Sequence, residues 1–98
     1  MPIWKLEPVN PKEHHWQASK YDGHVFIRAP DVMGARVIAS SAFSIPAQHF
    51  DGSELPLDPW THSVVTTCTR VETTDFDEDG PDIILGPPEA LSRARPLP

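Results

Sequence analysis

The sequence predicts an α+β protein with the element order β-β-α-β-β, in which a mostly antiparallel sheet of about four strands packs one face against one main helix. Three observations lead to this prediction. Short runs of β-branched and aromatic residues recur along the chain, bounded by proline, glycine and aspartate. One segment carries apolar residues at helical spacing. The 98 residues are enough to bury one core without a metal or a disulfide.

The first two strands are expected near the N-terminus. Residues 3–8 ("IWKLEP") alternate loosely, and Pro8 is expected to end an edge strand. Residues 24–29 ("HVFIRA") are rich in β-branched and aromatic side chains, which is typical of a strand. Because alternate residues of a strand point to opposite faces, Val25 and Ile27 share one face of it.

The main helix is predicted to follow the second strand directly. Asp31 is a suitable N-cap, and it comes after a proline that closes the strand. Small residues on the buried stripe would let the helix axis lie close to the sheet. The stripe has the spacing i, i+3, i+4, i+7 and consists of Ala35, Ile38, Ala39 and Ala42.

The second half of the chain predicts a long loop and two more strands. Residues 45–62 show no period, and Asp58 is expected to cap a single helical turn in "DPW". Residues 63–72 ("SVVTTCTRVE") are the strongest strand by composition, although the alternation leaves open which face is buried. Residues 82–85 ("DIIL") form a short apolar run, and the acidic turn between the two runs predicts a hairpin.

Composition indicates one domain and narrows the classes of partner. Residues 1–86 are expected to form a single small domain, and residues 87–98 a proline-rich disordered tail. A net charge of −6 with scattered basic residues argues against nucleic acid or a membrane as a partner. One cysteine, no signal-peptide pattern and no long apolar run favour a cytoplasmic protein.

The acidic turn "DFDEDGPD" (75–82) begins like a calcium-binding loop. An EF-hand loop closes its coordination sphere with a bidentate glutamate at position 12, which here is Gly86. A strand rather than a helix is also expected to enter the turn, so a solvated hairpin turn is the favoured interpretation. The weak metal candidates are Asp75, Asp77 and Asp79.

Other chemical motifs predict no catalytic residue and no cofactor. The five histidines lack the spacing of a zinc site. Cys68 lies in the middle of a predicted strand in an acidic protein, whereas a nucleophilic cysteine needs an electropositive surrounding. A cysteine that simply packs is the favoured interpretation.

The segment "YDGHVFIRAPDVMGARVIASSAF", followed by "DPW", "VTTCTRVE" and "DGPDIILGP", resembles small uncharacterised bacterial proteins of unknown function. The resemblance covers most of residues 3–86 and implies no particular activity. A looser similarity to small α+β antitoxin-type domains implies a protein partner, although no DNA-binding segment is present here.

These patterns together predict a non-enzymatic module that binds another protein or its own copy. One helix covers only one face of a sheet, and an uncovered apolar patch on a small domain marks an interaction site. The candidate interaction face is the opposite face, with the residues Ile3, Lys5, His24, Phe26 and Arg28.

The alternative is a small-molecule-binding protein or an enzyme, with a pocket between that sheet face and the 45–62 loop. The loop would then cover Phe26 through an aromatic or apolar side chain; if it does not, Phe26 is free to meet a partner. The covering candidates are Phe50, Leu57 and Trp60, and the polar groups of the pocket would be Lys5, His24, Arg28 and His62.

Overall fold

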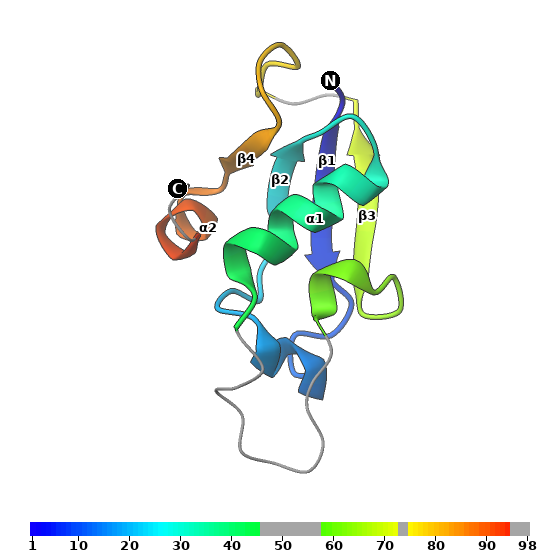
Figure 1. The fold of residues 1–98 in the computed structure, drawn as a ribbon, viewed down its shortest axis with the longest axis vertical. Helices are drawn as coiled ribbons and strands as arrows, with labels where there is room; N and C mark the ends of the chain where they lie inside the picture. The colour runs from blue at the N-terminus through cyan, green and yellow to red at the C-terminus, as the bar shows by residue number, and fades with distance from the viewer. Residues whose placement is uncertain (46–57, 73–74, 95–98) are drawn as a thin grey trace.

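The fold is a four-stranded antiparallel sheet with one main helix on one face, which confirms the predicted α+β class (Figure 1). The computed structural model describes residues 1–45, 58–72 and 75–94. The strands are β1 (Ile3–Pro8), β2 (Val25–Arg28), β3 (Thr66–Val71) and β4 (Ile83–Gly86). Among the described residues, the helices are α1 (Val32–Phe43), α2 (Pro88–Arg93) and two short 3₁₀ segments, η1 (His14–Ala18) and η3 (Pro59–Thr61).

The strand order β3-β1-β2-β4 corrects two predictions. β1 is a central strand and not an edge strand, because it pairs with both β2 and β3. Its last residue, Pro8, lies beyond Leu6, the last residue paired with β2, so the missing N–H costs no hydrogen bond on that side. β3 and β4 do not form a hairpin, because they occupy opposite edges of the sheet.

The helix α1 explains why the hairpin prediction is wrong. β2 and β3 both run antiparallel to β1, which lies between them, so they run in the same direction. Strands of the same direction need a crossover connection, and α1 supplies it across one face of the sheet. The connection from β3 to β4 therefore has to pass the ends of β1 and β2, and Figure 1 shows its described part, residues 75–82, above the end of the sheet.

The start and the buried stripe of α1 agree with the sequence prediction. The Asp31 carboxylate accepts a hydrogen bond from the Gly34 N–H at 2.7 Å, as expected of an N-cap. The predicted stripe faces the core, with Ile38 at its partly buried margin. The fully packed members of the helix are Ala35, Ala39, Ala42 and Phe43.

The core lies between α1 and the sheet and is closed at one end by aromatic rings. Trp60 is fully buried, with its ring centroid 5.3 Å from that of Phe43 and 4.9 Å from that of Trp16, the latter pair perpendicular. Asp58 caps η3 as predicted, accepting from the Trp60 N–H at 3.1 Å. The sheet side of this core is lined by Trp4, Leu6, Val25, Ile27 and Ala29.

The C-terminal segment differs from the disordered tail predicted from residue 87. Residues Pro88–Arg93 form α2, which packs beside β4. Ala90 is fully buried in the core, whereas its neighbour Leu91 is 48% exposed. Proline at the first helical position favours a helix rather than disorder, because its missing N–H has no intrahelical partner in any case.

The docking of α2 can be tested with two neighbouring substitutions. Ala90→Asp would bury an unpaired carboxylate and should lower the free energy of unfolding by at least about 2 kcal/mol. Leu91→Asp, on the exposed side of the same helix, should change it by no more than about 0.5 kcal/mol. Urea denaturation of both variants measures this, and equal small effects would show that α2 does not pack on the core.

Candidate functional site

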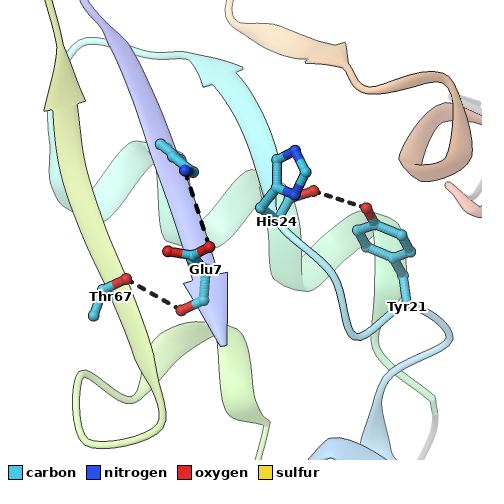
Figure 2. Close-up of polar contacts among 5 residues, drawn as sticks. Glu7, Tyr21, His24 and Thr67 are labelled. Carbon is cyan, nitrogen blue, oxygen red and sulfur yellow. Dashed lines mark hydrogen bonds and ion pairs between the residues drawn. The ribbon is translucent and has the colours of Figure 1, made fainter. Parts of the chain in front are cut away.

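The face of the sheet turned away from α1, called the outer face below, contains the predicted interaction residues. Figure 2 shows that Glu7, His24 and Thr67 lie on this face, with α1 behind the sheet. Lys5 Nζ is 3.9 Å from Glu7 Oε2, and Thr67 Oγ1 donates to the Glu7 carbonyl oxygen at 3.2 Å. This half of the outer face is therefore polar, and His24, Glu7 and Thr67 are exposed on it.

Two of the five predicted interaction residues are buried. Ile3 is fully buried, and Arg28, its neighbour in the register, is only 8% exposed. Arg28 Nε donates to the Pro81 carbonyl oxygen at 2.7 Å, and Nη1 donates to the Asp77 carbonyl oxygen at 2.8 Å. Arg28 thus anchors the acidic turn and offers no free guanidinium to a partner.

The acidic turn is organised by these backbone contacts. The N-terminal ammonium group donates to the Glu78 carbonyl oxygen at 2.9 Å, and the Asp79 N–H donates to Asp77 Oδ1 at 2.9 Å. Across residues 1–45, 58–72 and 75–94, no group of three acidic, histidine or cysteine side chains could hold a metal ion. The weak metal candidates Asp75, Asp77 and Asp79 therefore do not converge on one point in the structure.

The partly buried Phe26 is contacted by the acidic turn and not by η3. Its ring centroid lies 5.5 Å from that of Phe76 and 5.6 Å from that of His24. Trp60, one of the residues predicted to cover it, lies in the core on the α1 side of the sheet. The other two candidates, Phe50 and Leu57, lie outside the described residues.

Arg36 is a buried charged residue that the sequence prediction missed. It projects from α1, and its Nη1 and Nη2 donate to the carbonyl oxygens of Trp60 (3.1 Å) and Thr66 (2.9 Å). Thr66 Oγ1 in turn donates to the Pro59 carbonyl oxygen at 2.5 Å. These contacts fix η3 and the first residue of β3, so the role of Arg36 is to position the edge strand.

Cys68 lies half-buried in β3 on the side of the core. Burial raises the pKa of the Cys68 thiol, and the opposing influence of the Arg36 charge is the smaller one. The thiol therefore stays protonated at neutral pH, which agrees with a cysteine that packs and not with a nucleophile.

The outward edge of β3 carries free backbone groups. One residue before the strand, the Val65 carbonyl oxygen accepts from the Val9 N–H at 3.0 Å. Hydrogen-bonded and non-hydrogen-bonded pairs alternate along an antiparallel ladder. In the observed register, Thr67 and Thr69 therefore bond to β1, while Cys68 and Arg70 direct their N–H and C=O groups away from it. Within the described part of the chain, these four groups have no partner.

The opposite edge of the sheet is protected. β4 has four residues, its pairing with β2 shifts register between Phe26 and Ile27, and α2 packs beside it. Pro87 and Pro88, which follow β4 directly, cannot donate hydrogen bonds to an added strand. β3, by contrast, pairs over six successive residues without a shift. β3 is thus the edge that can accept another strand.

Most of the loop that would form one wall of the alternative pocket, residues 46–57, lies outside the described residues. His62 is exposed and hydrogen-bonded to the Asp58 carbonyl oxygen at 2.7 Å, on the segment that packs against α1, so it does not converge with Lys5 or His24. An open hollow of about 250 Å³ lies elsewhere, beside α2, and its walls carry charges of both signs. It is lined by Lys20, Tyr21, Asp22, Glu89, Ser92 and Arg93.

Tyr21 connects this hollow with the outer face. Its hydroxyl donates to the His24 carbonyl oxygen at 2.8 Å (Figure 2). Burial raises the pKa of Tyr21, and the carboxylates of Glu89 and Asp22 raise it further. The phenol is therefore neutral at physiological pH and acts as a hydrogen-bond donor.

Comparison with known proteins gives no relative for this chain. No protein-family model matches it, and no curated protein or solved structure is significantly similar to it. Among the described residues, no helix is both long enough and apolar enough to span a bilayer. The resemblance to small bacterial proteins stays a prediction.

The anchoring of the acidic turn by Arg28 can be tested at Gly80. This glycine has φ +128°, and a Cβ there would lie 2.5 Å from Arg28 Nη2. Gly80→Ala should therefore lower the free energy of unfolding by about 1–3 kcal/mol. Gly34→Ala is the same change in the first turn of α1 without a positive φ. Its Cβ would lie 3.2 Å from Asp31 Oδ1, and the gain in helix propensity offsets this contact, so the free energy of unfolding should change by less than about 1 kcal/mol. Thermal denaturation of the two variants distinguishes them, and equal stabilities would contradict the proposed anchoring.

The reactivity of Cys68 should follow its raised pKa. The folded protein binds the thiol proton more tightly than the unfolded chain, so this contribution to stability is complete below the unfolded pKa. It is lost as the pH rises through the folded pKa. Alkylation by iodoacetamide at pH 8 should accordingly be slower in the folded protein than in urea. An equal or faster rate in the folded protein would mean that the thiol is activated.

Proposed function

We propose that this chain is a non-enzymatic protein-binding module that engages its partner by accepting an extended strand at the edge of β3. The observation that carries the proposal is the set of outward N–H and C=O groups of Cys68 and Arg70, which have no partner among the described residues. An edge with unpaired backbone groups is a template for strand addition, and main-chain hydrogen bonds then supply the affinity.

The composition of β3 supports this mode of binding. Threonine and valine favour extended backbone, and the strand contains neither proline nor lysine, the residues that commonly protect an edge. Its one charged residue is Arg70. Thr67 and Thr69 are exposed on the outer face, so an added strand would place alternate side chains next to them and gain specificity there.

The accessible part of the predicted interaction face adjoins this edge. Lys5 pairs with Thr69 in the register on one side and with Phe26 on the other, so these side chains share the outer face. A strand bound at this edge lies directly beside Thr67 and Thr69. Lys5, His24 and Phe26 then form the polar and aromatic surface that a larger partner covers.

Charge and redox state define the setting of this module. A net charge of −6 disfavours nucleic acid and anionic membranes, so we assign a protein as the partner. We place the module in the cytoplasm, since its single unpaired thiol suits a reducing compartment.

The proposal is tested by blocking the edge without disturbing the sheet. Arg70→Pro removes an N–H that points away from β1, so the ladder to β1 stays complete, and Arg70→Ala is the control for loss of the charge. The wild-type chain and Arg70→Ala, immobilised and incubated with a lysate of the source cells, should retain the same proteins, with copies of the chain itself counted among them. Arg70→Pro should lose them. Circular dichroism checks that all three are folded. Equal retention by Arg70→Pro would rule out strand addition at β3.

The assignment of inward and outward residues has its own test. Thr69→Pro removes an N–H that bonds to β1, so it should lower the free energy of unfolding by about 1–3 kcal/mol more than Arg70→Pro does. Chemical denaturation measures the difference. Equal destabilisation would mean that the outward groups are assigned to the wrong residues.

A further inference from the structure

Resting on the proposed function, we infer that the occupant of the β3 edge is a second copy of this chain. The two β3 strands pair antiparallel about a twofold axis that passes beside Thr69.

The backbone groups select the register. Only Cys68 and Arg70 have both their N–H and their C=O directed to the open edge without a partner in the described chain. When the axis passes beside Thr69, Cys68 of each copy lies opposite Arg70 of the other. Each such pair exchanges two hydrogen bonds, so the two pairs use all the free groups of both strands.

Neighbouring registers are excluded by specific contacts. An axis beside Arg70 would place the two arginines directly opposite each other, which is destabilising. An axis beside Cys68 would pair Arg70 with Thr66 of the other copy. The Thr66 N–H already donates to the His62 carbonyl oxygen at 3.1 Å, and its own carbonyl oxygen already accepts from Arg36 at 2.9 Å.

The side chains are compatible with the selected register. On the outer face, Thr69 lies opposite Thr69 of the second copy, and Thr67 lies opposite Val71. Threonine pairs and β-branched pairs are favourable across antiparallel strands. Glu72, the next residue after β3, comes to lie opposite Thr66, so no like charges are placed directly opposite each other.

The number of open edges limits the assembly to two copies. The edge of β4 is protected by its shifted register, by α2 and by the prolines that follow it. Pairing through β3 therefore uses the open edge of each copy and gives a closed twofold dimer rather than a fibre. The two four-stranded sheets become one continuous sheet.

The two copies carry net charges of the same sign, and this determines how the dimerisation depends on salt. Each chain has a net charge of −6, so the copies repel each other over a distance that salt shortens. Raising the salt concentration should therefore strengthen the association, in contrast to binding of a basic partner, which it would weaken.

The register is tested by cysteine cross-linking in a Cys68→Ser background. Thr69→Cys places two cysteines at a non-hydrogen-bonded antiparallel pair, whose Cα atoms lie about 4.5 Å apart, within the range of a disulfide. Oxidised glutathione should convert this variant to a disulfide-linked dimer. The matched control is Thr67→Cys, on the same exposed face, where the two cysteines would be separated by about four residues along the strands and should not link.

The outcomes separate this inference from the proposed function. Sedimentation of the unmodified chain should show a concentration-dependent dimer that Arg70→Pro abolishes and that added salt strengthens. A chain that stays monomeric, with no cross-link at Thr69→Cys or with equal linking at Thr67→Cys, overturns the dimer. If the lysate capture remains sensitive to Arg70→Pro in that case, the occupant is another protein and only this inference fails. If the lysate capture is also unaffected by Arg70→Pro, the proposed function fails as well.

Discussion

The arrangement of this fold depends on the buried guanidinium of Arg36. Its hydrogen bonds to the carbonyl oxygens of Trp60 and Thr66 tie the crossover helix to the segment that leads into β3. Polar backbone groups that are buried without a partner are costly, so this contact allows an irregular segment to pack against the core. Because Trp60 also fills the end of the core, the position of β3 and the closure of the core are set together.

Arg28 plays the corresponding role on the outer face, at the other end of β3. It binds carbonyl oxygens of the acidic turn, which follows β3 in the sequence and lies beyond the end of the sheet. The segment before β3 and the turn after it are therefore each held by an arginine from a neighbouring element. The middle of the strand, at Cys68 and Arg70, is left with outward backbone groups that no described residue satisfies. The binding surface proposed for this protein is a consequence of how its edge strand is anchored.

Local patterns predicted the elements and the inward faces, whereas long-range contacts decided the rest. Asp31, Asp58 and the alternation of β2 act within a few residues and were predicted correctly. The hairpin was wrong because strand order depends on where α1 returns the chain. The two arginines were missed as structural residues because a charged side chain favours exposure, and its carbonyl partners leave no trace in the sequence. Arg36, Ser40 and Phe43 are spaced so that they share one face of α1. This spacing was the sequence signal that could have placed Arg36 on the packed side of the helix.

The central claim is that β3 is held at both ends and open along its outward edge, and amide hydrogen exchange tests it most directly. At protein concentrations low enough to keep the chain monomeric, the N–H groups of Thr67 and Thr69 should be protected, and those of Cys68 and Arg70 should exchange much faster. This alternation follows from the ladder to β1 alone. Uniform protection of all four amides at the lowest concentration would show that the edge is already covered, and fast exchange of all four would show that β3 is not paired as described. Either result would contradict the account.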